Sequence, residues 1–381
     1  ARARKCALPA SSSAPRPTTT FGPRPTTKTS PTSSRSNPNS HKKSPGRCTP
    51  RCRLRRKNSS PDAPEVIHSL AHYYSAIHRD YVRAAAEQGK VIRLLPNDPA
   101  GYNGLGFIQR RQRRWNEAIA NLRKGLQLDP GDFNASSALA NTLAAGRRYD
   151  DLVAARRRLV ELHPDSLSEA FSVAYGSFQA SGTARDVEGF FAGLTDKDRE
   201  SREGRTLRRT WADAQGNIAE AIRLDELLNP NGSTTLASAV RHAAIGDMAT
   251  ARTKLEKLPA ALRTQLEKEP ANAFAWRNLG RIEAVLGHKE EALRCARKAV
   301  ELLPESRDAM EGPPISAGLA FVFAWTGDKD GAMKEYARLL RVPYSGLNIY
   351  EMKHAPWCSP LRGDPRFEAL LNDPKNNAPL F

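Results

Sequence analysis

Two arginines four residues apart, Arg277 and Arg281, have the type and spacing that point most directly to binding chemistry. Side chains at positions i and i+4 lie on one face of a helix, so both guanidinium groups should project from the same side, beside Asn278. A guanidinium group pairs with a carboxylate through two parallel hydrogen bonds. The pattern therefore predicts a contact with acidic groups of a partner peptide.

A second set of candidate binding residues lies earlier in the chain. Asn103 and Asn141 can hydrogen-bond a peptide backbone, and Phe107 can make apolar contact with a ligand. Arg110 can pair with an acidic group and is the first residue of the segment RRQRR. The alternative is that this arginine cluster is solvated surface that favours the C-terminal end of a helix dipole.

The histidines and cysteines do not form a metal-binding or catalytic pattern. His68 and His72 are one helical turn apart, but the zinc-protease motif needs a glutamate where Ser69 stands. Cys48 and Cys52 lack a second ligand pair at zinc-site spacing. The sequence also lacks a P-loop, a glycine-rich kinase loop and a nucleophile elbow. We therefore expect a protein without enzymatic activity, metal or cofactor.

The arginine pair belongs to a stretch, Asn272–Glu305, that predicts two short helices broken at Gly287. Apolar residues recur at helical spacing, and small residues fall where two helices must approach closely. The residues that carry the pattern are Trp276, Leu279, Gly280, Ala292, Ala296, Ala299 and Pro304. One such pair cannot bury its own apolar face, so neighbours with the same spacing are expected.

The tryptophan, the leucine–glycine pair, the alanines and the closing proline resemble the tetratricopeptide signature, which repeats every 34 residues. The unit Pro99–Asp132 keeps this register with Tyr102, Leu105–Gly106, Ala118 and Pro130. The units Phe133–Ser166 and the one that begins at Pro313 also keep the register, and Glu65–Asp98 fits it more loosely. The resemblance implies an all-α, right-handed superhelix (an α-solenoid) of about eight helix pairs, whose first helices line a concave groove.

The repeat register divides the chain into five parts. We expect a disordered tail rich in Pro, Ser, Thr and Arg over 1–64, clear units over 65–166, degenerate units over 167–270, clear units over 271–345 and a closing segment over 346–381. In the closing segment, Asp364 and Pro365 should open a helix that caps the last unit. Within the degenerate part, Gly193–Gly204 has the composition of a charged connection.

The net charge of +18 is concentrated in the tail. The first 64 residues hold 15 of the 59 Lys and Arg residues but one of the 41 acidic residues. Because the rest of the chain is nearly neutral, we expect nucleic-acid binding only weakly, through the tail. The sequence shows no apolar run long enough for a membrane helix, no signal-peptide core and no even cysteine framework. These features predict a cytoplasmic protein without membrane contact.

Three segments also resemble the C-terminal repeat regions of large bacterial signalling proteins that carry a serine/threonine kinase, adenylate cyclase or TolB-like domain. They are Arg110–Phe133, Gly146–Ser166 and Ser359–Leu371. The resemblance implies a regulatory or assembly module, without the catalytic domain of those proteins. Chaperone-binding members of the repeat family hold a C-terminal carboxylate with lysine and asparagine at set first-helix positions. Those positions are occupied here by Asn103 and Phe107, and by Arg277 and Arg281, which disfavours that ligand.

The sequence thus predicts a non-catalytic protein-interaction scaffold or adaptor that binds a partner peptide or helix in the groove. The alternative is the regulatory or sensory region of a signalling enzyme, separated from its catalytic domain. The partner's identity, the oligomeric state and the role of residues 1–64 stay open.

Overall fold

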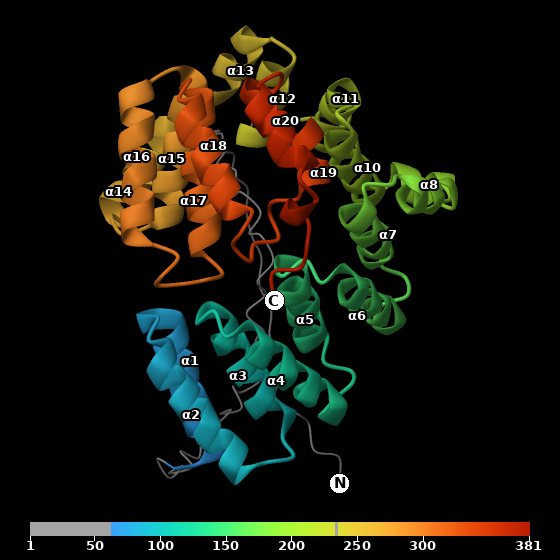
Figure 1. Cartoon of the computed structure of the whole chain (residues 1–381), viewed down its shortest axis with the longest axis vertical. Helices are drawn as coiled ribbons and strands as arrows, with labels where there is room; N and C mark the ends of the chain where they lie inside the picture. The colour runs from blue at the N-terminus through green and yellow to red at the C-terminus, as the bar shows by residue number, and fades with distance from the viewer. Residues whose placement is uncertain (1–61, 233–234) are drawn as a thin grey trace, which may run out of the picture. The chain divides into compact units, whose positions relative to one another are not determined.

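The computed structural model describes residues 62–232 and 235–381, and within these ranges it contains twenty α-helices and no strand (Figure 1). The predicted tail therefore lies almost wholly outside the described residues. The described chain folds into helical hairpins, which confirms the predicted all-α solenoid. Eight pairs of sequence-adjacent helices pack as hairpins: α1/α2, α3/α4, α5/α6, α7/α8, α10/α11, α12/α13, α15/α16 and α17/α18.

The helix bounds follow the repeat register in the clear units. The first three pairs are α1 (Pro64–Tyr73), α2 (Tyr81–Leu94), α3 (Pro99–Arg111), α4 (Trp115–Leu128), α5 (Phe133–Ala145) and α6 (Tyr149–Leu162). The last two are α15 (Ala273–Leu286), α16 (Lys289–Leu302), α17 (Gly312–Trp325) and α18 (Lys329–Leu339). The middle contains α7 (Leu167–Ser181), α8 (Arg185–Ala192), α9 (Asp196–Glu200), α10 (Arg202–Gln215), α11 (Ile218–Leu228), α12 (Leu236–Ala244), α13 (Met248–Leu255) and α14 (Leu258–Lys268).

The α15/α16 hairpin forms where its cap and turn residues predict. Asn272 caps α15, because its Oδ1 accepts a hydrogen bond from the backbone N–H of Ala275 at 3.0 Å. Gly287 ends the helix in the left-handed region with φ of 92°, which glycine adopts without strain. Gly280 lets α16 approach, because a Cβ there would lie 2.9 Å from the carbonyl oxygen of Ala292. This packing turns the opposite face of α15, with the arginine pair, toward α17.

Replacing Gly280 by alanine is expected to lower the free energy of unfolding by about 1–3 kcal/mol, because the new methyl group meets the rigid backbone of α16. Gly189 in α8 is the matched control, since a Cβ there meets no atom within 4 Å. Alanine at Gly189 should instead stabilise its helix by up to about 1 kcal/mol. Urea unfolding of both variants measures the two changes in the free energy of unfolding. Equal changes would contradict a close approach of α15 and α16 at Gly280.

The predicted charged connection Gly193–Gly204 is partly helical, and that prediction was wrong in its second half. Thr195 caps the short α9 by accepting the N–H of Asp198, and Ser201 caps α10 by accepting the N–H of Gly204. A helix of five residues with charged faces carries little apolar periodicity, so the sequence pattern missed α9. The helix α14 was missed as well.

The closing segment contains α19 (Ile349–His354), a 3₁₀ turn (Pro356–Leu361) and α20 (Pro365–Asn372). Asp364 caps α20 by accepting the N–H of Arg366 at 3.0 Å, as predicted. Phe367 and Leu371 of α20 are buried in one apolar cluster with Tyr336 and Leu339 of α18. The helix therefore covers the last repeat, which confirms its capping role.

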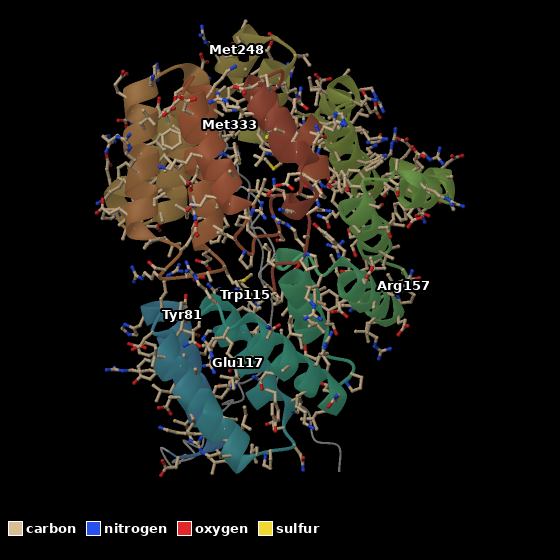
Figure 2. All side chains as sticks on the ribbon, in the orientation of Figure 1. Tyr81, Trp115, Glu117, Arg157, Met248 and Met333 are labelled. Atoms are coloured by element: carbon tan, nitrogen blue, oxygen red, sulfur yellow. The ribbon has the colours of Figure 1, made fainter. Side chains whose placement is uncertain are left out.

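Asp308, in the loop between α16 and α17, joins the first hairpins to the last ones. Its carboxylate is fully buried and accepts hydrogen bonds from the hydroxyl of Tyr81 at 2.6 Å (Tyr81 is labelled in Figure 2) and from Nη1 of Arg79 at 3.0 Å. Arg111 Nη1 approaches the same oxygen at 2.5 Å. The backbone N–H groups of Met310 and Glu311, in the same loop, donate to the other carboxylate oxygen of Asp308. Residues far apart in sequence thus share one buried carboxylate.

Candidate functional site

The residues predicted to bind a partner fall into two groups on different helices. Asn103, Phe107 and Arg110 lie on α3, and Asn141 lies on α5. Arg277, Asn278 and Arg281 lie on α15. Only Arg277 and Arg281 share a described cavity, which the residues of the first group do not line. The contacts that each group makes decide what it can do.

The α3 group is largely engaged by neighbouring helices. Asn103 is 4% exposed, and its Nδ2 donates to Oδ2 of Asp132, the cap residue of α5, at 2.8 Å. The guanidinium of Arg110 lies over the ring of Phe107 at 5.4 Å and donates to the carbonyl oxygen of Ala138 at 3.2 Å. Burial lowers the pKa of Arg110 to about 10. Their roles in partner binding stay predictions, and the observed contacts join α3 to α5.

Asn141 differs from the other residues of its group because its side chain is exposed. It is the one predicted asparagine of α3 and α5 that is open to solvent in the described range. No contact in the structure tests its proposed hydrogen bond to a peptide backbone.

The two arginines of α15 extend between α15, α17 and the segment after α18. The guanidinium of Arg281 lies over the ring of Phe321 at 4.7 Å, and that of Arg277 lies over Phe274 at 5.1 Å. Gly318 of α17 leaves the space for Arg277, since a Cβ there would lie 2.4 Å from its Cγ. Arg277 Nη2 donates to Oδ1 of Asn278 at 2.9 Å. The helix spacing therefore places both cations side by side, as predicted.

Neither arginine has an ionic partner among residues 62–232 and 235–381. The Nε of Arg281 is buried without a hydrogen-bond acceptor. Burial lowers the pKa of Arg277, and burial together with the positive charge of Arg277 lowers the pKa of Arg281 to about 10. Some buried arginines of this chain have an ionic partner, as Arg241 has Asp213 at 2.6 Å, whereas Arg110 and Arg147 donate to backbone carbonyl oxygens instead. An uncompensated pair of buried cations costs free energy, so a ligand anion would relieve it.

The cavity in front of the arginines has a volume of about 220 Å³. Aromatic and apolar side chains from α17, α18 and the part of the chain that follows α18 form its other walls: Phe321, Tyr336, Tyr344, Leu347 and Trp357. Ligand pockets for drug-sized molecules measure about 300–1,000 Å³. The space therefore suits one acidic side chain or a small carboxylate, and it is too small for a helix.

Sequence reasoning identified the two cations but missed the aromatic wall. Tyr344, Leu347 and Trp357 come from outside the regular hairpins. The sequence marks Tyr344 and Trp357 only as aromatic residues in a segment that lacks the repeat spacing, and it gives no signal for Leu347. Burial raises the pKa of Tyr344, which keeps its hydroxyl neutral and able to donate a hydrogen bond to an anion.

The rest of the described chain offers no metal site or membrane span. No three His, Cys, Asp or Glu side chains gather as metal ligands in residues 62–232 and 235–381. In the same part of the chain, no helix is both long and apolar enough to cross a membrane. The buried thiols of Cys295 and Cys358 have a pKa raised to about 12 by burial, so neither is a reactive thiolate at neutral pH.

The comparison with protein families decides the identity of the hairpins. The sequence profile described as "Tetratricopeptide repeat" matches residues 99–132 and 273–306, which are the α3/α4 and α15/α16 hairpins. These two hairpins therefore match the tetratricopeptide-repeat profile. The second matched repeat carries Arg277 and Arg281. A search of curated proteins finds no match.

Several solved structures are similar to the chain, and two of them are described as tetratricopeptide-repeat proteins. One from Parabacteroides merdae shares 17% identity with a TM-score of 0.45, over 68% of this chain and 98% of the other. Yeast Tom70 shares 15% identity with a TM-score of 0.45, over 71% and 56%. YrrB, described as having an unusual peptide-binding site, shares 15% with a TM-score of 0.28, over 65% and 89%.

Proposed function

We propose that the chain is a non-catalytic protein-interaction scaffold whose Arg277–Arg281 cavity receives an acidic side chain of a partner peptide. The proposal is supported chiefly by one observation: two adjacent, partly buried guanidinium groups have no ionic partner among the described residues. A carboxylate that enters the cavity would compensate both charges in surroundings where ion pairs are stronger than in water. The aromatic wall would exclude water from the pair.

The size of the cavity supports a partner that inserts one side chain. A volume of about 220 Å³ fits a glutamate or aspartate side chain, while the rest of the peptide would lie along exposed surface. Asn141 is a candidate for contact with that peptide's backbone, because it is exposed. The regulatory role within a bacterial signalling enzyme and the cytoplasmic location are further proposals, and they rest on the sequence pattern alone.

Paired peptides test the proposal. Immobilised 12-residue peptides are offered to the full-length protein, each glutamate-containing peptide beside its glutamine counterpart. We expect a subset of peptides to bind at least tenfold better with glutamate, and that preference to vanish in the Arg277→Ala/Arg281→Ala double variant. Arg294→Ala is the matched control, because Arg294 is exposed and paired with Glu291. Peptide binding that does not depend on glutamate or on the arginine pair would contradict the proposal.

A further inference from the structure

The arginine cavity between α15, α17 and α18 (labelled in Figure 1) is rich in hydrogen-bond donors. Each guanidinium has several N–H donors in one plane and no acceptor. Arg277 directs Nε and Nη2 to a single oxygen, Oδ1 of Asn278, at 3.2 and 2.9 Å. Arg281 makes no hydrogen bond to the described residues, and none of the residues that line the cavity is acidic. Most N–H groups of the pair therefore have no acceptor in the described chain.

Two tyrosines add hydroxyl groups to the same cavity. Tyr336 of α18 and Tyr344, which follows that helix, both line it. The positive charge of Arg281 acts on both phenols, and that of Arg277 acts on Tyr344. Neither hydroxyl has a hydrogen-bond partner within residues 62–232 and 235–381. Because burial raises the pKa of both tyrosines, each keeps a proton that it can donate.

Two glycines leave the space in which these donors meet. Besides Gly318, which makes room for Arg277, Gly346 makes room for Tyr344, because a Cβ there would lie 2.3 Å from the tyrosine hydroxyl oxygen. Both glycines line the cavity, and neither has a positive φ. Space, rather than an unusual backbone conformation, therefore requires glycine at both positions.

The number of charges distinguishes one acidic ligand from another. A carboxylate brings one negative charge to two guanidinium groups and leaves positive charge in the cavity. A phosphate monoester carries about −1.5 to −2 charges at pH 7 and has three strong acceptor oxygens. It can compensate both cations and still accept a hydrogen bond from a tyrosine hydroxyl. Arginine clusters recognise phosphorylated motifs through such charge-assisted bonds.

We infer that the preferred ligand of the arginine cavity is an alkyl phosphate monoester, carried by a phosphorylated serine or threonine of the partner peptide. Arg277 and Arg281 pair with two of its oxygens, and Tyr344 donates to the third. Leu347 and Trp357 supply apolar surface for its carbon stem. This inference rests on the proposed function and names the chemical class of the acidic side chain. Binding then requires a kinase reaction that phosphorylates the partner.

Blocked single residues test the ligand class on the full-length protein. N-acetyl-O-phosphoserine amide, N-acetylglutamate amide and inorganic phosphate are compared by titration calorimetry at neutral pH and matched ionic strength. We expect the phosphoserine derivative to bind at least tenfold more tightly than the glutamate derivative, because it compensates both cations. Neither derivative should bind the Arg277→Ala/Arg281→Ala variant. Inorganic phosphate should bind at least threefold more weakly than the phosphoserine derivative, since it has no carbon stem.

The outcomes of this titration separate the inference from the proposed function. If both derivatives bind through the arginine pair but the glutamate derivative binds equally well or better, the proposed function stands and the inference is overturned. If neither derivative binds the unaltered protein, both are contradicted. Inorganic phosphate that binds as tightly as the phosphoserine derivative would assign the cavity to free phosphate, which also overturns the inference.

Tyr344→Phe tests the donor to the third oxygen. The substitution keeps the ring and removes the hydroxyl, so the preference for phosphoserine should fall below threefold while the glutamate derivative still binds. Tyr73→Phe is the matched control, because Tyr73 lies on α1 and its side chain is exposed, and it should keep the full preference. An unchanged preference in a folded Tyr344→Phe protein would overturn the place of Tyr344 in phosphate recognition.

Discussion

Replacing Asp308 by alanine is expected to lower the free energy of unfolding by about 2–3 kcal/mol, because the substitution leaves the buried Tyr81 hydroxyl without its acceptor and leaves Arg79 and Arg111 with Glu311 as their one remaining acidic partner among the described residues. Asp308 is fully buried and accepts hydrogen bonds from Arg79, Arg111 and Tyr81, on the first hairpins. Its removal would weaken the link between these hairpins and the loop before α17, where Glu311 would still pair with Arg79 and Arg111. Urea unfolding followed by circular dichroism measures the change.

The pH dependence of stability gives an independent test of the same carboxylate. Burial alone would raise the pKa of Asp308, but the charge of Arg111, the hydroxyl of Tyr81 and two backbone N–H groups lower it below its usual value. A carboxylate with a lowered pKa stabilises the fold above its unfolded pKa, about 3.9, and that contribution is lost as the pH falls through the folded pKa. The difference between the unaltered protein and Asp308→Ala should therefore shrink in acid.

Asp330 provides the control for Asp308. Its side chain is exposed and pairs with the exposed Arg366. Surface pairs contribute about 0–1 kcal/mol, so Asp330→Ala should change stability little. An Asp308→Ala protein as stable as the Asp330→Ala protein would contradict the proposed link between the first and last hairpins.

Replacing Arg281 by methionine is expected to raise the free energy of unfolding by about 1–2 kcal/mol while it abolishes anion binding. The guanidinium has no ionic partner in the described chain, and its Nε is buried without an acceptor. Replacing buried charge with an apolar side chain of similar length is often neutral or stabilising, and methionine adapts to irregular spaces. Stability gained with loss of binding is typical of a functional site. Thermal and urea unfolding measure the gain.

The pKa of Arg281, lowered to about 10, predicts how the free-energy cost of burying its charge depends on pH. A cation whose pKa is lowered on folding destabilises the fold while it is charged, and the cost is relieved as the pH rises past the folded pKa. The advantage of Arg281→Met should therefore be present at neutral pH and shrink above pH of about 10. Arg294→Met, at an exposed paired site, is the control and should gain nothing. A loss of more than about 1 kcal/mol in Arg281→Met would show that the cation is structural.

The repeat register predicted the fold because it depends on local signals. Asn272, Gly287 and Asp364 act as caps and stops in the positions that their residue types indicate. The i and i+4 spacing also placed Arg277 and Arg281 on one face of α15. These features need only the residues of one hairpin.

The parts that sequence reasoning missed depend on residues distant in the chain. Asn103 shares a register position with binding residues of other repeats, but Asp132 at the next hairpin engages it. Tyr344 and Trp357 complete the arginine cavity from a segment without periodicity. Phe381 reaches Trp115 across most of the chain. Repeat spacing carries no information about such contacts.

The most direct test of the central claim is a titration with glutarate, a small dicarboxylate, followed by the thermal unfolding midpoint at matched ionic strength. A ligand that binds only the folded state raises stability by RT ln(1 + [L]/Kd), about 1.4 kcal/mol at ten times its Kd. We expect a saturable rise of the midpoint in the unaltered protein and none in Arg277→Ala/Arg281→Ala. The same rise in both proteins, or no rise in the unaltered protein, would contradict an anion site at the arginine pair.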